Sequence, residues 1–109
     1  MASEFLKIAS DDNFQKEVLE NPLPVLIDFW AEWCGPCKAL TPTVEALAKD
    51  YAGKIAFYKM NVDDNQNTPV QYGVRSIPTL VLLKGGQKVD QIIGAVPRGT
   101  LEEALKKVL

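Results

Sequence analysis

The two cysteines of the chain are the residues whose type and spacing point most directly to chemistry. Cys34 and Cys37 lie in the hexapeptide WCGPCK, which follows a run of apolar residues and begins a helical pattern. A disulfide needs two β-carbons about 4 Å apart, and two intervening residues at the start of a helix meet that requirement. The spacing therefore predicts a pair that converts between dithiol and disulfide.

The position at a helix start predicts different roles for the two sulfurs. Free amide groups and the helix dipole favour a thiolate at Cys34, and a strand-to-helix turn should leave Cys34 exposed. Cys37 falls on the inward face with Leu40 and Val44, so it should be shielded. We expect Cys34 to attack a partner disulfide and Cys37 to attack the mixed disulfide that results. Pro36 suits the first helical turn and stiffens the ring.

Three other interpretations of the pair are a structural disulfide, half of an intermolecular zinc site and two buried inert thiols. A loop this short restricts the unfolded chain little, so it would be a poor structural disulfide. With two cysteines and no histidine, the chain cannot supply the usual ligands of a tetrahedral zinc site by itself.

The elements around the pair follow from the hydrophobic pattern. Residues 25–30 are nearly all apolar, which is typical of a strand covered on both faces of a mainly parallel sheet. A helical pattern from the cysteines to Gly53 and a further strand over residues 55–62 complete a strand–helix–strand unit, whose strands should be parallel.

The remaining elements predict an α/β fold with one central sheet and helices on both faces. Further strands are expected over residues 5–9, 78–83 and 88–93, the last two joined by a tight turn at Gly85 and Gly86. The other expected helix starts are Ser10, with Asp11 and Asp12 at the positive end, Thr68, and a capping box over residues 100–103.

Bulk composition fits one soluble domain over residues 1–109. The chain is 47% hydrophobic and 24% charged, and its net charge of −2 offers no basic surface for nucleic acid or anionic lipid. Residues 1–7 show no signal-peptide pattern, and no apolar run approaches the ~20 residues of a membrane helix. We therefore expect no membrane association and a cytoplasmic location, where a disulfide is more often catalytic than structural.

Several motifs together resemble the thioredoxin family over essentially the whole chain. They are the hexapeptide after FWAE (residues 29–32), the segment GVRSIPT (residues 73–79) and Gly94. The resemblance implies a thioredoxin fold with a five-stranded mixed sheet and four helices. It also implies reduction of protein disulfides without a cofactor, re-reduction by a thioredoxin reductase, and a monomer.

Asp28 is the one charged residue in the apolar run of residues 25–30. An ionised carboxylate is costly to bury, so the pKa of Asp28 should rise. The resemblance places Asp28 beneath Cys37 as a general base acting through water. The alternative is a structural carboxyl paired with Lys59 on the neighbouring strand. Lys59 itself is either that charge partner or a lysine whose head group reaches solvent at a strand edge.

Pro78 would be an ordinary turn proline on sequence alone. The resemblance implies a cis Ile77–Pro78 bond facing the cysteines, which leaves the backbone of Ile77 free to pair with an extended substrate. It also implies an apolar, small-residue rim for substrate. This rim consists of Trp33, Gly73, Ile77, Gly94 and Ala95.

The dipeptide Gly35-Pro36 between the cysteines contains no histidine, which favours a reductant over an oxidant. A function of another class remains open: a protein-binding module that uses the same rim without exchange chemistry.

Overall fold

The structure, a computed structural model, describes residues 4–109. Residues 1–3, part of the segment without a signal-peptide pattern, lie outside this range. The strands are β1 (Leu6–Ile8), β2 (Val25–Trp30), β3 (Ala56–Asn61), β4 (Thr79–Lys84) and β5 (Gln87–Ile93). The helices are η1 (Phe14–Leu19), α1 (Gly35–Asp50), α2 (Asn67–Gln71) and α3 (Arg98–Leu105), with the short η2 (Lys106–Val108) after α3. Within residues 4–109, no helix is both long and apolar enough to cross a membrane.

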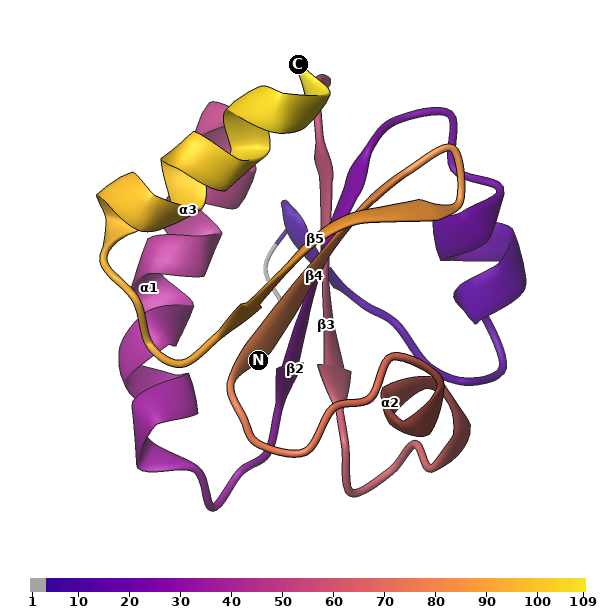
Figure 1. Cartoon of the computed structure of the whole chain (residues 1–109), viewed down its shortest axis with the longest axis vertical. Coiled ribbons are helices and arrows are strands. Elements are labelled where there is room, and N and C mark those ends of the chain that lie inside the picture. The colour runs from indigo at the N-terminus through magenta and orange to yellow at the C-terminus, as the bar shows by residue number, and fades with distance from the viewer. Residues whose placement is uncertain (1–3) are drawn as a thin grey trace.

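The sheet is five-stranded and mixed, in the order β1-β3-β2-β4-β5. β1 and β2 both pair with β3 in parallel, whereas β4 is antiparallel to β2 and to β5. Helices α1 and α3 cover one face, and η1 and α2 cover the other (Figure 1). β2 is the central strand, and its apolar sequence is explained because helices cover both of its faces. The predicted fold class is therefore confirmed.

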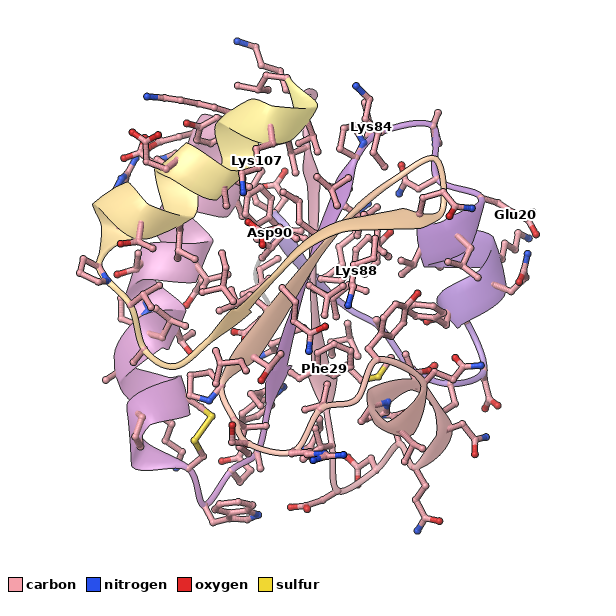
Figure 2. All side chains as sticks on the ribbon, viewed as in Figure 1. Glu20, Phe29, Lys84, Lys88, Asp90 and Lys107 are labelled. Atoms are coloured by element: carbon pink, nitrogen blue, oxygen red, sulfur yellow. A yellow bond between two sulfur atoms is a disulfide. The ribbon has the colours of Figure 1, made fainter. Side chains whose placement is uncertain are left out.

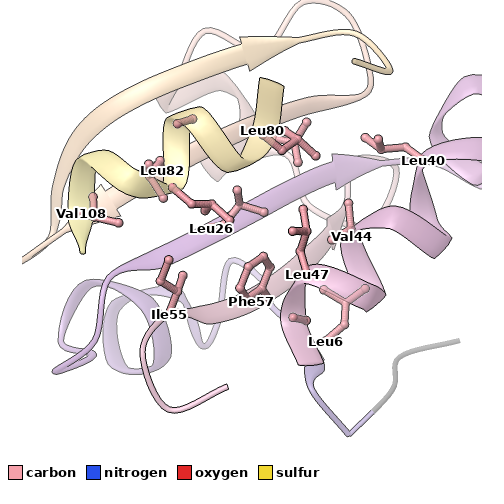
Figure 3. Close-up of a cluster of buried hydrophobic side chains, with 14 residues drawn as sticks. Leu6, Leu26, Leu40, Val44, Leu47, Ile55, Phe57, Leu80, Leu82 and Val108 are labelled. Carbon is pink, nitrogen blue, oxygen red and sulfur yellow. The ribbon is translucent and has the colours of Figure 1, made fainter. Parts of the chain in front are cut away.

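Alternation along β2 sends its side chains into two separate core clusters. Leu26 joins the cluster beneath α1 and α3, together with Val44 and Leu80 (Figure 3). Ile27 and Phe29 join the cluster on the other face. Because successive strand residues point to opposite faces, Asp28 lies on the Leu26 face, under α1.

The turn between β4 and β5 is the predicted pair Gly85 and Gly86, with φ of +59° and +78°. Two consecutive positive φ values are typical of the tight turns whose twist matches a β-hairpin. A β-carbon on Gly86 would also lie 3.2 Å from the carbonyl oxygen of Leu19. The backbone conformation therefore favours glycine at Gly86, and a β-carbon there would also crowd Leu19.

The predicted helix starts are wrong in three places. η1 begins at Phe14 with Asn13 in the N-cap position; Ser10 and Asn13 instead exchange two side chain–backbone hydrogen bonds around the preceding turn. Thr68 lies inside α2.

α3 begins at Arg98, so the expected capping box at residues 100–103 is inside the helix. Here Pro97 starts the helix early, since its carbonyl already accepts from the amide of Thr100.

A pair of glycine variants tests the turn. Gly86→Ala should lower the free energy of unfolding by about 1–2 kcal/mol, because it imposes a left-handed conformation on a residue with a β-carbon. Gly99→Ala in α3 is the matched control: nothing lies within 4 Å of its β-carbon, and the helix should gain up to about 1 kcal/mol. Urea unfolding of both variants measures the difference, and equal effects would contradict the argument.

Candidate active site

The cysteines lie at the start of α1, just after the loop that follows β2. Cys34 occupies the N-cap position of α1 in extended conformation, and Gly35 and Pro36 are the first helical residues. Cys34 and Cys37 form a disulfide with their α-carbons 5.3 Å apart, within the usual range. Figure 2 shows this disulfide as the yellow bond at the beginning of α1. The structure therefore describes the oxidised state.

The helix start supplies a hydrogen bond to the first sulfur. The backbone amide of Cys37 donates to Sγ of Cys34 at 3.2 Å. On the other side, the same sulfur lies 3.8 Å from the carbonyl oxygen of Ile77. An amide donor at a helix N-terminus stabilises negative charge, so after reduction this position favours a thiolate on Cys34.

Cys34 is less accessible than the sequence predicts. Only 4% of its surface is exposed, compared with 0% for Cys37. Trp30, Val62 and Ile77 pack around the pair and account for the shielding. The expected exposure of Cys34 is thus wrong, although Cys37 is the more deeply buried of the two.

Asp28 is buried on the same face of the sheet as α1, with 2% of its surface exposed. Its Oδ1 atom has no hydrogen-bond partner among residues 4–109. Burial raises the pKa of Asp28 from 3.8 to about 7, and the positive charge of Lys59 opposes part of that rise. The carboxyl of Asp28 therefore exchanges its proton near neutral pH.

Lys59 lies directly across from Asp28 in the β2–β3 register. Within the described residues, no ion pair joins the two side chains; Nζ of Lys59 instead sits 4.7 Å from the ring centroid of Trp30. β3 lies between β1 and β2, so Lys59 is not at a sheet edge. The ammonium head borders a pocket of about 250 Å³ that Glu32, Lys38 and Thr41 also line. Only 6% of the surface of Lys59 is exposed, and Lys59 acts on Asp28 through its charge.

The Ile77–Pro78 peptide bond is cis. The carbonyl of Pro78 accepts from the amide of Gly94 at 2.8 Å, which ties this turn to the end of β5. Gly94 has a φ of +100°, and Gly73, just after α2, has a φ of +64°. Ala95 follows Gly94 and is exposed.

An apolar pocket of about 390 Å³ opens beside Trp33 and Ile77. Trp33 is 70% exposed, and its indole N–H donates to Asp63 Oδ2 at 2.9 Å. Sequence reasoning identified Trp33 and Ile77 but missed the rest of the wall. The missed residues are Val62, Pro69, Val74, Arg75 and Ser76. The signal was a series of apolar residues in a segment otherwise rich in Asp, Asn and Gln.

Within residues 4–109, no group of three or more acidic, histidine or cysteine side chains could hold a metal ion. The group with evident reactivity is the disulfide itself. A disulfide whose one sulfur faces an amide donor, beside a buried carboxyl of raised pKa, fits thiol–disulfide exchange.

Comparison with known proteins agrees with this chemistry. The family model described as Thioredoxin matches residues 5–107. The chain is 55% identical over 100 residues to "Thioredoxin M4, chloroplastic" of Arabidopsis thaliana, covering 92% of this chain and 52% of that protein. It is 53% identical to "Thioredoxin" of Synechocystis sp. over 92% of this chain and 94% of the relative. A third relative, "Thioredoxin" of Rickettsia conorii, is 53% identical over 89% of this chain and 92% of its own length.

The chain thus spans about half of the Arabidopsis protein and nearly all of the two bacterial ones. The family match covers almost all of the described residues and includes β2, the cysteine pair and the cis-proline segment. The chain therefore belongs to the thioredoxin family, and its chemistry is the dithiol–disulfide exchange of a thiol–disulfide oxidoreductase.

Proposed function

We propose that the protein reduces disulfides in other proteins, with Cys34 as the attacking sulfur. The observation that carries this proposal is the amide of Cys37 donating to Sγ of Cys34 at the start of α1. The Cys34 thiolate attacks one sulfur of the substrate disulfide, and that disulfide bond breaks as a mixed disulfide forms. The departing substrate thiolate takes up a proton. The Gly35-Pro36 dipeptide, without histidine, supports a reductant rather than an oxidant.

Cys37 then resolves the mixed disulfide. Asp28 accepts the proton of the Cys37 thiol through an intervening water, and the Cys37 thiolate attacks Sγ of Cys34. The second substrate thiolate leaves, and the Cys34–Cys37 disulfide described here is the product. Two electrons have then passed from the dithiol to the substrate. The pKa of Asp28, raised to about 7 by burial, supports this role, with Lys59 adjusting it from the neighbouring strand.

The substrate segment binds along the rim around Cys34. Trp33 and Ile77 supply apolar contact, and Gly73, Gly94 and Ala95 leave room for a second backbone. The carbonyl oxygen of Ile77 lies 3.8 Å from Sγ of Cys34, and the polar groups of this backbone pair with an extended substrate.

The wider setting follows from the family. We infer that a thioredoxin reductase restores the dithiol, that no cofactor is needed beyond the disulfide, and that one monomeric domain over residues 1–109 suffices. The cytoplasm is the compartment we propose, since reduction of disulfides requires a reducing environment. Two Arabidopsis relatives are named chloroplastic, so a fluorescent fusion in the native cell is the measurement that decides the compartment.

Reduction of insulin tests the activity. With NADPH and a thioredoxin reductase, the parent protein should reduce insulin disulfides catalytically, and Cys34→Ser should lose this activity because the attacking sulfur is gone. Cys37→Ser should instead accumulate a mixed disulfide through Cys34, which mass spectrometry detects. A Cys37→Ser protein that forms no adduct while Cys34→Ser does would reverse the assignment.

The Cys34→Ser/Cys37→Ser double variant separates exchange from binding. It should fail to rescue a strain that depends on the parent protein. Full rescue by the double variant would support the binding-module function instead.

Asp28→Asn tests the general base. Formation of the mixed disulfide should proceed at the parent rate, whereas release should slow by at least about tenfold, because general base catalysis typically contributes more than that. Single-turnover kinetics with a chromophoric substrate separate the two steps. Asp12→Asn, which changes the same charge at an exposed position, is the control. Equal release rates in Asp28→Asn and the parent would reject the base role.

The same substitution has a pH-dependent effect on stability. A pKa of about 7 in the folded protein, against 3.8 unfolded, means that ionisation of Asp28 opposes folding by about 4 kcal/mol. Because the pKa of Asp28 is higher in the folded than in the unfolded protein, the folded state of the parent is most stable below pH 4. It loses this stability as the pH rises from 4 to 7. The unfolding free energy of the oxidised parent minus that of Asp28→Asn should fall over this range and stay constant above it. A difference independent of pH would show that burial does not hold the proton on Asp28.

A further inference from the structure

Asp11 lies between β1 and η1, yet it binds a segment more than fifty residues away. The sequence places Asp11 at the positive end of the first helix. In the structure, its Oδ2 accepts from the backbone amide of Asn67, and its Oδ1 accepts from both the amide and the hydroxyl of Thr68. These three hydrogen bonds measure 3.1, 2.9 and 2.7 Å. Asp11 therefore caps α2, the short helix on the lower right of Figure 1.

A fourth hydrogen bond extends this attachment. The backbone amide of Asp11 donates to Oδ1 of Asn65 at 2.7 Å, and Nδ2 of Asn65 donates to the carbonyl of Asn61 at the end of β3. Asn65 is buried, with 7% of its surface exposed. Burial of Asp11 opposes its ionisation, but the hydrogen bonds from Thr68 and Asn67 outweigh that effect and hold its pKa below 3.8. Asp11 is thus a fixed anion at neutral pH, held by four hydrogen bonds to residues 65–68.

The residues that Asp11 binds lie immediately before the segment that forms most of the apolar pocket beside Cys34. Six of the seven lining residues lie between positions 62 and 77, and Trp33 is the seventh. Pro69 lies in α2, and its carbonyl accepts from the amide of Val74, the next wall residue. The chain then continues through Arg75 and Ser76 to Ile77, whose carbonyl faces Sγ of Cys34. The cap on α2 therefore helps to fix the position of this wall.

We propose that Asp11 is a positioning residue for protein substrates: by capping α2 it holds the wall of the pocket beside Cys34. The proposal rests on the proposed function, since the pocket matters only if a polypeptide lies against it. Asp11 does not line the pocket beside Cys34. Its loss should change recognition of a polypeptide and leave the exchange chemistry at Cys34 unchanged.

Two substrates of different size separate these effects. Reduced parent, Asp11→Ala and Asp11→Asn proteins are assayed with insulin and with the small disulfide 5,5′-dithiobis(2-nitrobenzoate). Removing a helix cap costs enough to lower the equilibrium constant for the capped wall by about threefold to tenfold, and this factor is the largest rise in KM that the loss can produce. We therefore expect KM for insulin to rise by up to that factor in Asp11→Ala, with kcat and the rate with the small disulfide within twofold of the parent.

The conservative variants should give a graded response. An asparagine oxygen at position 11 retains the two bonds to Thr68 and loses the one from Asn67, so Asp11→Asn should be intermediate. Thr68→Val removes only the hydroxyl donor and is the mildest change. Asp12→Asn, an exposed neighbour with the same charge change, should match the parent.

The outcomes are distinguishable from failure of the proposed function. A parent that reduces neither substrate contradicts the proposed function, whatever the variants do. A parent active on both substrates, with Asp11 variants that match it on insulin or lose both activities equally, overturns the positioning role. The melting temperature of each variant is measured by thermal unfolding, and the assays are run below it.

Discussion

The active site depends on the contact between one amide and one sulfur at the start of α1. The N–H of Cys37 donates to Sγ of Cys34 only because both residues share the first turn of a helix. Helices leave their first amides without internal partners, so such a sulfur receives a donor without any additional residue. The positive end of the helix adds to the effect. Two cysteines at this spacing therefore differ in chemistry before any other side chain is considered.

The contact holds its position because the preceding strand is the most constrained element of the fold. β2 lies between β3 and β4 and is covered by helices on both faces. All but its last residue are buried, and Phe29 and Ile27 are fully so. A strand packed on both faces has little freedom to shift, because the interior is close to crystal density. The strand end and the helix start that follows are therefore set by the core rather than by the loop between them.

Two aspartates show how position rather than residue type determines the behaviour of a carboxyl group. Asp28 is buried among apolar side chains, one of its oxygens makes no hydrogen bond within residues 4–109, and its pKa rises to about 7. Asp11 receives three hydrogen bonds on its two oxygens, and its pKa falls. The first is suited to exchange a proton near neutral pH. The second is suited to remain charged and hold structure.

The sequence predicts best what neighbouring residues determine. The apolar run of β2, the helical spacing of Leu40 and Val44, and the Gly85–Gly86 turn are local signals, and the structure confirms each. Asp11 shows the limit of local signals. An aspartate just before a helical pattern is predicted to lie at the positive end of that helix, whereas the fold brings Asp11 to α2.

Two other features lay outside what local pattern can decide. Only the family resemblance implies the cis bond before Pro78, because a single X–Pro sequence is compatible with both isomers. The burial of Cys34 arises from Val62 and Ile77, which are distant in sequence. The pocket wall was missed for the same reason, since its apolar residues are scattered through a polar segment and meet only after α2 is in place.

These long-range features converge on one side of the cysteines. β2 and α1 bring the sulfurs and Asp28 into position. β2 is the central strand of the sheet, and α1 packs on its core cluster. The proposed substrate-facing groups come instead from Trp33, from residues 62–77 and from the turn beyond β5. These segments are short loops and one short helix. Such segments bury little apolar surface of their own, so hydrogen bonds from elsewhere in the chain must hold them. Three such bonds join these segments to other parts of the chain: Thr68 donates to Asp11, Trp33 donates to Asp63, and the amide of Gly94 donates to the carbonyl of Pro78. Reactivity thus resides in the core elements, whereas the proposed recognition surface lies in a segment held by a few polar contacts. Substitutions there should alter which proteins are reduced before they alter the reduction itself.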